Sequence, residues 1–310
     1  MKIHPRFVGC DVCKHHLDIF EADGGRTRRI DNSDEAIAAW LAGLPARSDR
    51  HIVFEATGRY DRRLAAGLEA RGVCFSRVNP ARARDFARAL GVMAKTDRID
   101  ARLLAAMGQA LEPAQTPARE DARDALAGLH KRRDQLVAMR QKEKVRLAEA
   151  SPRERASLER HLAWLDAEIA EVEAQRDALL RADPQLARPN RLLRSIPGIG
   201  PVAAATLLAL LPELGTASPK AVAALAGLAP FNVDSGRFRG HRAIRGGRRR
   251  VRNALYMAAV AAWRSRTRLG AFAQALIDRG KPFKLAIIAL ARKILLTANA
   301  ILRDEVPFHA

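Results

Sequence analysis

The sequence predicts a chain of the α/β plus α class, in which a mixed-sheet domain precedes a mainly helical remainder. Between residues 7 and 78, short apolar or alternating runs typical of strands are interspersed with helical segments. Beyond residue 119, helix-forming residues dominate and strand patterns become rare. With 310 residues, the chain is long enough for two or three domains with a sizeable core.

Three strands are expected at the start of the chain. Phe7 to Val12 is a short apolar run that predicts a buried strand, with Asp11 near its end. The alternating segment from His15 to Ala22 predicts a second strand. Arg26 to Ile30, after the Gly24-Gly25 turn, predicts a third. Because these runs follow one another closely, we expect an antiparallel meander.

Helices and strands then alternate. His51 to Phe54 predicts a fourth strand, with Glu55 at its C-terminal end. The order β-β-β-α-β-α-β-α suits a mixed sheet with helices on both faces. Ligands of such sheets gather at strand C-terminal ends, where Asp11 and Glu55 fall. The other expected elements are a helix from Asn32 or Ser33 to Leu41, a helix from Asp61 to Ala70, a strand from Gly72 to Val78, and helices opening at Asn79-Pro80 and near Asp97.

Asp97 and Asp100 follow Thr96, which can cap a helix. Residues three apart share a helix face, so the two aspartates would point the same way. Acidic residues also suit the start of a helix dipole, which gives the pair a purely structural explanation. Together with Asp11 and Glu55, however, this pair makes four carboxylates. Brought close together, they would repel one another unless they held a divalent metal ion. The set therefore predicts a magnesium site acting on phosphates. In a narrower alternative, only one of Asp97 and Asp100 binds metal.

The net charge of +20 predicts a polyanionic partner, most simply nucleic acid. A basic surface of ribosomal type would give the same charge. The N-terminus lacks the apolar run of a signal peptide. The apolar run from Leu285 to Leu302 is interrupted by Arg292 and Lys293, which predicts a packed helix rather than a membrane span. We therefore expect a cytoplasmic, nucleoid-associated protein with no membrane partner.

The three cysteines are Cys10, Cys13 and Cys74, and an odd number argues against a disulfide framework. Cys10 and Cys13, with two histidines nearby, could suggest zinc. The pair lies in a strand pattern, however, where positions three apart face opposite sides, and no second ligand pair follows with finger spacing. Core cysteines are the preferred interpretation.

The middle of the chain predicts a helical hairpin. Pro113 and Pro117 mark a break, and residues 119 to 182 are charged, poor in glycine and rich in helix formers. Ser151-Pro152 reads as the turn between two long helices of coiled-coil character, which dimerise or space domains. Apolar stripes support both helices: Leu126, Leu129, Leu136 and Val137 in the first, and Leu158, Leu162, Leu165, Ile169, Val172 and Leu179 in the second.

After Pro184 and Pro189, residues 195 to 201 contain the turn Gly198-x-Gly200 before an apolar helix. This pattern is typical of a helix-hairpin-helix, whose free N–H groups bind a DNA phosphate without reading sequence. A structural helix turn is the alternative.

An arginine-rich segment follows and is expected to be loop-like, because several glycines punctuate it. It contains no acid, which indicates contact with phosphates. Its arginines are Arg237, Arg239, Arg242, Arg245, Arg248, Arg249, Arg250 and Arg252. A helix from Val251 to Trp263 and further helices would complete the chain.

These features together resemble a known family. The order of elements and acids in the N-terminal part resembles the ribonuclease-H-like fold in its Holliday-junction-resolvase, or RuvC-like, form. The whole chain resembles the DEDD transposases of bacterial insertion sequences, described as bridge-RNA-guided recombinases. The motifs are Phe7-Val8-Gly9-Cys10-Asp11, Phe54-Glu55-Ala56-Thr57-Gly58-Arg59-Tyr60, Asn79-Pro80, Lys95-Thr96-Asp97-Arg98-Ile99-Asp100-Ala101, Ile196-Pro197-Gly198-Ile199-Gly200, Gly227-Leu228-Ala229-Pro230, Ser235-Gly236 and Gly246-Gly247-Arg248.

The resemblance implies a RuvC-like domain over residues 1–115, a helical hairpin or coiled coil over 116–184, and a C-terminal transposase domain over 185–310. Asp11, Glu55, Asp97 and Asp100 would be the metal-binding tetrad for Mg²⁺, with Mn²⁺ as the alternative ion. Ser235 would be the nucleophile that attacks a DNA phosphodiester. The implied partners are donor and target DNA, a non-coding guide RNA, and further copies of the chain in a dimer or tetramer.

Four alternatives remain open at this level. Asp-Ser-Gly is ordinary turn chemistry, so Ser235 could be a turn residue, and Tyr256 is a rival nucleophile. The protein could be a metal-dependent, junction-resolving nuclease that uses water, which needs the tetrad but not the serine. It could also be a non-catalytic nucleic-acid-binding protein, which would tolerate the loss of any single carboxylate.

Overall fold

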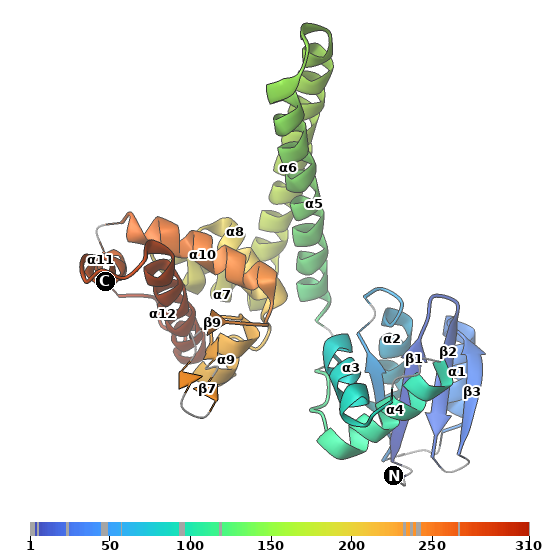
Figure 1. The fold of residues 1–310 in the computed structure, drawn as a ribbon. Helices are drawn as coiled ribbons and strands as arrows, with labels where there is room; N and C mark the ends of the chain where they lie inside the picture. The colour runs from blue at the N-terminus through green and yellow to red at the C-terminus, as the bar shows by residue number, and fades with distance from the viewer. Residues whose placement is uncertain are drawn as a thin grey trace. The chain divides into compact units, whose positions relative to one another are not determined.

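The computed structural model describes residues 4, 6–22, 25–44, 49–56, 58–92, 97–117, 120–231, 234–235, 238–239, 243–265 and 267–309. For residues 26, 97–99, 234–235 and 238–239, the description covers the backbone but not the side chain. The chain divides into two compact units, Met1–Ala118 and Arg119–Ala310, and each is described by itself (Figure 1).

The first unit is built on a five-stranded sheet in the order β3-β2-β1-β4-β5. β1 pairs antiparallel with β2, and β2 with β3, whereas β4 is parallel to both β1 and β5. The mixed sheet and its antiparallel meander, as predicted from the sequence, are therefore confirmed. The strands are β1 (Phe7–Val12), β2 (His16–Glu21), β3 (Arg26–Asp31), β4 (His51–Glu55) and β5 (Cys74–Val78).

Helices cover both faces of this sheet. On one face, Cys10 packs in a core with Trp40 from α1. On the other face, Phe7 and Val53 pack with α3 and α4. Because alternate residues of a strand face opposite sides, Asp11 shares the α4 face with Phe7. The helices of this unit are α1 (Asp34–Ala42), α2 (Arg62–Arg71), α3 (Pro80–Ala89) and α4 (Asp97–Leu111).

Helix α4 crosses β1 at very short range (Figure 1). A Cβ atom added at Gly9 would overlap the backbone oxygen of Ala101. Farther along the helix, a Cβ at Gly108 would lie 2.8 Å from Cγ2 of Val53 and 2.9 Å from Cδ1 of Phe7. Since Phe7 precedes Gly9 while Gly108 follows Ala101, α4 runs antiparallel to β1. The first turn of α4 therefore lies toward the C-terminal ends of β1 and β4.

The segment that leaves α4 covers the β5 edge of the sheet. The N–H of Thr116 donates to the carbonyl oxygen of Phe75 at 2.8 Å, and the N–H of Arg77 donates to Oγ1 of Thr116 at 2.9 Å. The hydroxyl of Ser76 donates to the carbonyl oxygen of Ala114 at 2.7 Å. These hydrogen bonds fix the exit segment to the first unit as far as Thr116.

Two long helices open the second unit, α5 (Asp121–Glu149) and α6 (Pro152–Ala182). They pack as a hairpin along a small apolar core that includes Leu136 and Leu165 (Figure 1). At the turn, the N–H of Ser151 donates to the carboxylate of Glu154 at 2.9 Å, which completes a capping box at the start of α6. The predicted helical hairpin and its turn are confirmed, while its coiled-coil character and role in dimerisation remain predictions.

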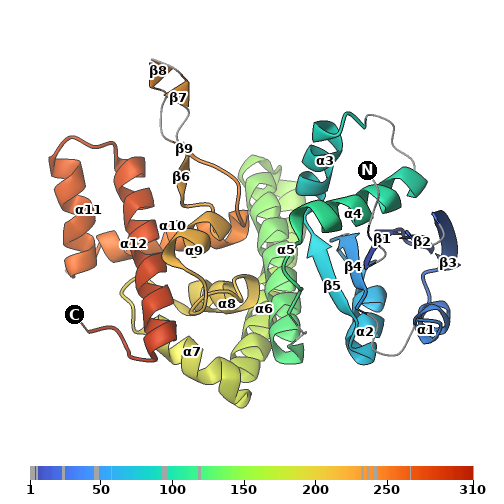
Figure 2. The same cartoon turned by 90° about the horizontal axis from the view of Figure 1, so that it is seen from below.

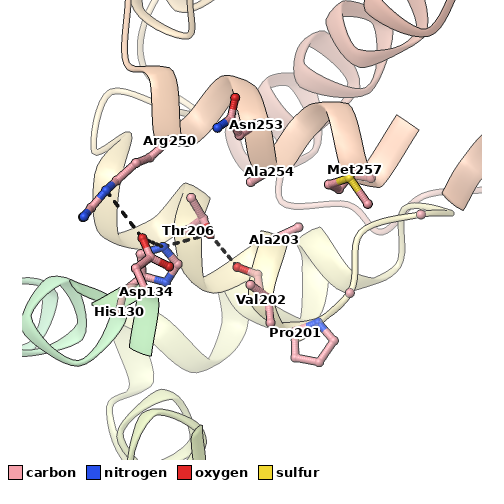
Figure 3. A pocket seen from close by; sticks show the side chains of 13 residues that line it. His130, Asp134, Pro201, Val202, Ala203, Thr206, Arg250, Asn253, Ala254 and Met257 are labelled. Atoms are coloured by element: carbon pink, nitrogen blue, oxygen red, sulfur yellow. Dashed lines mark hydrogen bonds and ion pairs between the residues drawn. The ribbon is translucent and has the colours of Figure 1, made fainter. Parts of the chain in front are cut away.

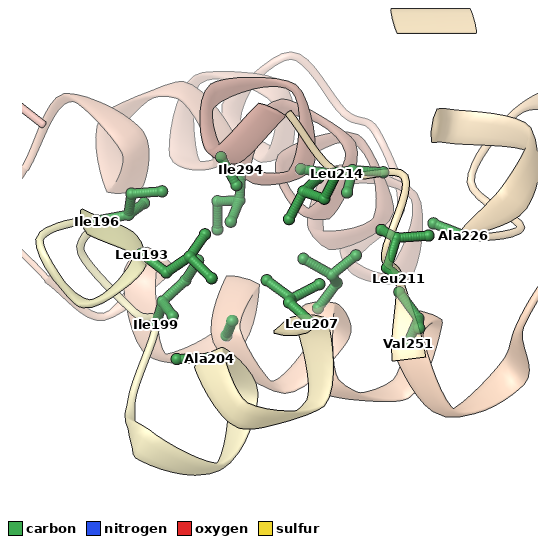
Figure 4. Close-up of a cluster of buried hydrophobic side chains, with 14 of the residues drawn as sticks. Leu193, Ile196, Ile199, Ala204, Leu207, Leu211, Leu214, Ala226, Val251 and Ile294 are labelled. Carbon is green, nitrogen blue, oxygen red and sulfur yellow. The ribbon is translucent and has the colours of Figure 1, made fainter. Parts of the chain in front are cut away.

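The remaining helices enclose one large apolar core (Figure 4). Leu207 of α8, Val251 of α10 and Ile294 of α12 are fully buried within it. The helices are α7 (Pro184–Arg194), α8 (Pro201–Leu210), α9 (Pro219–Leu225), α10 (Arg249–Trp263), α11 (Arg268–Asp278) and α12 (Phe283–Asp304). Short strands interrupt them between α9 and α10: β6 (Pro230–Phe231), β7 (Asp234–Ser235), β8 (Phe238–Arg239) and β9 (Ala243–Ile244).

The arginine-rich segment is only partly a loop, which corrects the expectation from the sequence. α10 begins at Arg249, two residues before the predicted helix start, so its first turn contains the last arginines of the run. The physical reason is burial. Val251 and Leu255 are fully buried, and packing of this apolar face stabilises a helical turn that the arginines and glycines alone would not predict.

Helix α12 is long and apolar enough to cross a membrane by length and composition, but half of that stretch is buried inside the unit. Ile287, Leu290 and Ile294 belong to the core. This is the arrangement of a packed core helix, as the sequence predicts for this run.

Candidate functional site

Asp11 and Glu55 lie side by side on the α4 face of the sheet. β1 and β4 are parallel, with Gly9 opposite Val53 and Cys10 opposite Phe54, so the register continues to Asp11 beside Glu55. Neighbouring strands are about 4.8 Å apart, which brings the two carboxylates within reach of one ligand. Both side chains are partly exposed. The structure thus places together two acids that the sequence predicts at strand ends.

Sequence reasoning missed a third acid on the same face, Asp18 of β2. Asp18 lies directly opposite Asp11 in the antiparallel β1–β2 pair, and opposite residues share a face. Asp18, Asp11 and Glu55 therefore form a row across three adjacent strands. The only signal in the sequence is the tight turn after Asp11, since pairing around that turn brings residue 18 back to residue 11.

The charge of Asp18 is compensated from the neighbouring strand. Arg29 of β3 lies opposite Asp18 and donates from Nε at 3.0 Å and from Nη2 at 2.7 Å to its two oxygens. The Asp18 side chain is only 3% exposed, whereas that of Arg29 is 55% exposed. Nε2 of His16 lies 3.5 Å from the same carboxylate. Asp18 is therefore a buried, bidentate-paired acid beside the more exposed Asp11 and Glu55.

Asp97 and Asp100 begin α4, whose first turn lies toward the strand ends that carry Asp11 and Glu55. Asp100 is partly exposed, while the side chain of Asp97 lies outside the described residues. Lys95 and the expected cap Thr96 also lie outside them. Within the described part of the chain, no three His, Cys, Asp or Glu side chains form a ready metal-binding group. The donor chemistry of this face is nevertheless that of hard oxygen ligands, which suit Mg²⁺.

Cys10 points to the opposite face from Asp11, and the structure makes it a core residue. Burial, reinforced by the charges of Asp11 and Asp18, raises the pKa of the Cys10 thiol well above its ordinary value. A thiol held in its protonated form is a poor zinc ligand. Cys13 is half-buried, and its Sγ lies 3.8 Å from Oδ2 of Asp11, while Cys74 is exposed. The predicted core role is thus confirmed for Cys10 and wrong for Cys74, which begins β5 with its side chain exposed.

Ser235 belongs to the second unit. It lies on β7, whose two residues pair with β8 through Asp234–Arg239 and Ser235–Phe238. Figure 2 shows this hairpin at the end of the extension that β6 and β9 begin. The Ser235 side chain lies outside the described residues, as does Gly236.

The predicted phosphate-binding arginines fall into distinct groups. Arg245, Arg249 and Arg250 are exposed. Arg248 instead pairs with both oxygens of Glu213, at 2.5 and 2.7 Å, and Arg252 donates to the carbonyl oxygen of Gly246 at 2.7 Å. These last two therefore hold the start of α10 in place. Arg237 and Arg242, with the side chain of Arg239, lie outside the described residues.

The Arg248–Glu213 pair also has an electrostatic signature. Burial alone would raise the pKa of Glu213, but the hydrogen bonds and charge of Arg248 outweigh it and lower that pKa below its ordinary value. The ionised pair thus anchors the start of α10 to the segment after α8.

The Gly198-x-Gly200 turn joins α7 to α8 and packs against α10. Gly198 has φ +92°, and a Cβ there would overlap the backbone oxygen of Ala258. Gly200 is the N-cap of α8, has open space around its Cα and provides no side-chain cap. The first glycine is therefore required for packing, while the second leaves the start of α8 open.

Two family models match the chain. A DEDD-type IS110 transposase model matches residues 8–150, which include the carboxylate row. A model described as transposase IS116/IS110/IS902 family matches residues 190–274, which include Ser235 and the arginine-rich segment. The first model thus matches most of the first unit and the start of the second, and the other model lies within the second unit.

Two named relatives are similar over nearly the whole length, and a third over part of it. The pilin gene-inverting protein of Moraxella bovis is 31% identical over 315 residues, covering 97% of each chain. The protein of that name from Moraxella lacunata is 31% identical over 312 residues, again covering 97% of each chain. An insertion element IS110 uncharacterized protein of Streptomyces coelicolor is 36% identical over 136 residues, 43% of this chain and 32% of that protein.

Proposed function

The chain belongs to the IS116/IS110/IS902 transposase family, and on that premise we propose that it cuts and exchanges DNA strands through the hydroxyl of Ser235, assisted by a divalent metal ion. Membership makes DNA recombination its activity. The proposal concerns the nucleophile, the metal and the nucleic acids that take part.

The first unit, in a RuvC-like arrangement, would hold the metal through Asp11, Glu55, Asp97 and Asp100. The first two are neighbours by strand register, and the start of α4 lies toward the same strand ends. Carboxylate oxygens suit Mg²⁺, with Mn²⁺ as the alternative ion. Bound there, the metal would neutralise phosphate charge and favour the ionised form of an attacking hydroxyl.

Ser235 would attack the phosphorus of a DNA phosphodiester. The Oγ–P bond forms, one P–O bond to a sugar breaks, and the departing sugar oxygen takes up a proton. The serine proton leaves to a base or to water, since a neutral hydroxyl is a poor nucleophile. The arginines beside this hairpin would stabilise charge that develops on the phosphate. Reversal of the step on a different strand end would complete the exchange.

The second unit would bind the nucleic acids. Arg245, Arg249 and Arg250 are exposed, and no acidic residue occupies the first turn of α10. Arginine side chains near the N-terminus of a helix are repelled by the positive end of the helix dipole, and a bound phosphate chain relieves that repulsion. The Gly198–Gly200 turn would add a sequence-independent phosphate contact of helix-hairpin-helix type. Donor DNA, target DNA and a non-coding guide RNA are the proposed partners.

Ser235 and the carboxylates belong to different units, so an active site needs residues from both, within one chain or from two copies. We therefore include a dimer or tetramer in the proposal, with the α5–α6 hairpin as its proposed contact. The relatives named for pilin gene inversion support a reaction that exchanges two DNA junctions, because inversion of a segment requires cutting at both of its ends.

The observation that carries the proposal is the carboxylate face of the first unit. Asp11 and Glu55 are adjacent by register, and α4 crosses β1 at Gly9 with its first turn toward the same strand ends. A structural role for the two acids does not require them at neighbouring strand ends. It is the arrangement expected of metal-assisted phosphoryl transfer.

The test is a search for a covalent protein–DNA adduct. Purified protein, element DNA, flanking RNA and Mg²⁺ are incubated and separated on a denaturing gel. Wild-type protein should give an adduct that Ser235→Ala lacks. Ser218→Ala makes the same chemical change at the N-cap of α9 in the same unit, and it should retain the adduct.

A second function is favoured by the first unit taken alone, because its acids would suffice for a nuclease that uses water. In that case DNA is cut without an adduct, and cleavage survives Ser235→Ala. This outcome would overturn the serine mechanism and return Ser235 to a turn residue.

A further inference from the structure

Asn32 is a buried amide at the edge of the sheet where the candidate acids lie. It directly follows β3 and is 6% exposed. β1 and β3 both pair antiparallel with β2, so β3 ends at the same edge of the sheet as β1, and β4 is parallel to β1. Asn32 therefore lies at the same edge as Asp11 and Glu55, although β2 separates β3 from β1.

The side chain of Asn32 lies on the face of the sheet opposite the acids. The N–H of Asn32 donates to the carbonyl oxygen of His15 at 3.0 Å, which continues the β2–β3 pairing by one residue. Arg29 shares the α4 face with Asp18, so Ile30 and Asn32 face the other side by strand alternation. Ile30 packs there against the core that contains Trp40. Asn32 is therefore no metal ligand, and it can act on the acids only through the backbone.

The Asn32 amide joins the two chain segments that follow the acids. Nδ2 donates to the carbonyl oxygen of Cys13 at 2.8 Å and to that of Tyr60 at 2.9 Å. Cys13 comes two residues after Asp11, and Tyr60 comes five residues after Glu55. The orientation of the amide follows from its partners, because a flipped amide would place Oδ1 against two carbonyl oxygens. One NH₂ group thus links the turn after β1 to the segment after β4.

This link lies just beyond the point where β1 and β4 stop pairing. The ladder between them ends with Cys10 opposite Phe54, one position before Asp11 and Glu55. Backbone hydrogen bonds fix the separation of two strands only as far as the ladder extends. Asn32 connects the same two chain segments again on the far side of the acids.

The segment that Asn32 holds after β4 is fixed from its other side as well. Asp61 follows Tyr60 directly and is fully buried. Arg77 of β5 donates to Oδ2 of Asp61 from Nε at 2.9 Å and from Nη2 at 2.8 Å. Nη1 of Arg63 on α2 donates to the carbonyl oxygen of Asn32 at 2.8 Å. The segment after β4 is therefore tied to the end of β3 on one side and to β5 on the other.

Helix capping does not account for the Asn32 amide. The N-cap of α1 is Ser33, whose Oγ accepts from the N–H of Ala36 at 3.2 Å. Oδ1 of Asn32 is buried and has no hydrogen-bond partner within the described residues. A buried acceptor without a partner reduces stability, so it offsets part of what the two donated hydrogen bonds contribute. The two donors are thus the feature that this position uses.

We infer that Asn32 is a positioning residue of the proposed metal site. By holding Cys13 and Tyr60, its amide keeps the strand ends that carry Asp11 and Glu55 at a separation at which both carboxylates reach one divalent ion. Groups outside the ligand shell commonly orient metal ligands in this way. The inference rests on metal binding by the first unit, as in the proposed function, and it does not involve Ser235.

The test is Mn²⁺ binding to the full-length protein without nucleic acid, measured from the electron paramagnetic resonance signal of the free ion. Asn32→Leu has a side chain of similar size without donors. It should raise the dissociation constant for Mn²⁺ about tenfold, as the loss of outer contacts of a metal site does. Asn32→Ser, which can donate one hydrogen bond, should raise it less and serves in place of Asn32→Leu if that variant does not fold.

Hydrogen exchange provides a readout that needs no metal. Loss of the amide should speed exchange in the peptides that contain Cys13 and Tyr60, because local opening is easier where hydrogen bonds between segments are lost. Peptides from the middle of β1 and β4, where the ladder is intact, should exchange at the wild-type rate.

A buried amide of the second unit provides the matched control. Asn299 is 3% exposed, and its Nδ2 donates to the carbonyl oxygen of Ala217 at 3.0 Å while its Oδ1 accepts from the N–H of Gly215 at 2.8 Å. Asn299→Leu is therefore the same change at an amide that also fixes loop backbone. It should lower thermal stability but leave the Mn²⁺ dissociation constant within about twofold, since the two sites are independent.

A second control removes a buried hydroxyl. Figure 3 shows Thr206 of α8, whose Oγ1 donates to the carbonyl oxygen of Val202 at 2.7 Å and lies 3.2 Å from Nε2 of His130 on α5. Thr206→Val removes this link between helices and should likewise leave Mn²⁺ binding unchanged. Ile37→Val controls for general loss of stability in the first unit, because Ile37 is 1% exposed in the core beside α1 and makes no contact of this kind.

The outcomes separate this inference from the proposed function. Weaker Mn²⁺ binding in the Asn32 variants, but not in the three controls, supports it. If Asp11→Asn weakens Mn²⁺ binding while the Asn32 variants do not, the inference is overturned and the proposed metal site stands. Equal weakening by Ile37→Val would also overturn it. If the wild-type protein binds no Mn²⁺, the proposed metal site fails and the inference fails with it. Failure of the serine mechanism alone changes none of these results, because Ser235 belongs to the other unit.

Discussion

In the first unit, the candidate acids lie on strands whose positions are fixed from both sides, whereas Ser235 in the second unit lies on a strand of two residues. Asp11 and Glu55 are placed by continuous register and by the close crossing of α4 over Gly9. Among the described residues, β7 pairs with β8. The proposed chemistry is therefore divided between acids within a five-stranded sheet and a serine on a two-residue strand.

The two units therefore position their reacting groups in different ways. A metal site needs several ligands held to within about half an ångström, which a sheet and a packed helix provide. The proposed serine nucleophile would instead have to reach different DNA strands in turn. Substitutions in each unit test whether the carboxylates and Ser235 are positioned differently.

The largest effect is expected at the carboxylate face. Asp11→Asn should reduce strand cleavage on the order of 10³-fold or more, since it removes a charge that supports the transition state. Nucleic-acid binding, measured by gel shift, should stay within about twofold, because we propose that the second unit binds the nucleic acids. Asp121→Asn, on the first turn of α5, is the matched control. Loss of binding together with folding would show that Asp11 is a structural acid.

The next largest effect concerns how firmly α4 is fixed on β1. Gly9→Ala should destabilise the first unit by about 3 kcal/mol, because its methyl group has no space beside Ala101. Gly128→Ala, in the interior of α5 with open space around it, should instead stabilise its helix by up to about 1 kcal/mol. Urea unfolding gives both values. Equal, small effects would mean that α4 is not fixed on β1.

The acid that sequence reasoning missed gives a third prediction. Asp18→Asn should cost about 2 kcal/mol, since it leaves Arg29 without its partner, although the exposure of Arg29 reduces the loss. It should also raise the Mg²⁺ concentration needed for cleavage, because it changes the charge beside Asp11. Asp85→Asn breaks an exposed pair with Arg88 in the same unit and should change neither quantity. A loss of stability without a shift in Mg²⁺ dependence would limit Asp18 to a structural role.

The smallest effect is a pH dependence that both units share. Burial lowers the pKa of His51, with Arg6 acting in the same direction, and burial likewise lowers that of His130. The unfolded histidines therefore take up protons at higher pH than the folded ones. The contribution of the two neutral histidines to the free energy of unfolding is present above about pH 6.5 and decreases as the pH falls. His51→Gln and His130→Gln should each flatten the decline measured by thermal unfolding between pH 7 and 5. An unchanged slope in either variant would show that its histidine titrates normally.

The sequence predicts the order of elements along the first unit and the helical hairpin well because their patterns are local. Period-two and helical stripes identify the strands and helices, and strand ends alone indicate Asp11 and Glu55. The partner of Asp18 could not be predicted, since it depends on the register across a turn. The contact between His130 and Thr206 could not be predicted either, because the two residues are 76 positions apart in the sequence. The helical start at Arg249 follows from burial of Val251, a tertiary effect that overrides the glycines.

The exit segment that covers β5 has a consequence for the solubility of the sheet. An open edge strand offers unpaired N–H and C=O groups to any other extended chain and is a common origin of aggregation. Here Thr116 occupies that position beside Phe75 and Arg77. The shortest fragment of the first unit suitable for separate production must therefore extend through Thr116, and one that ends before Pro113 should associate edge to edge.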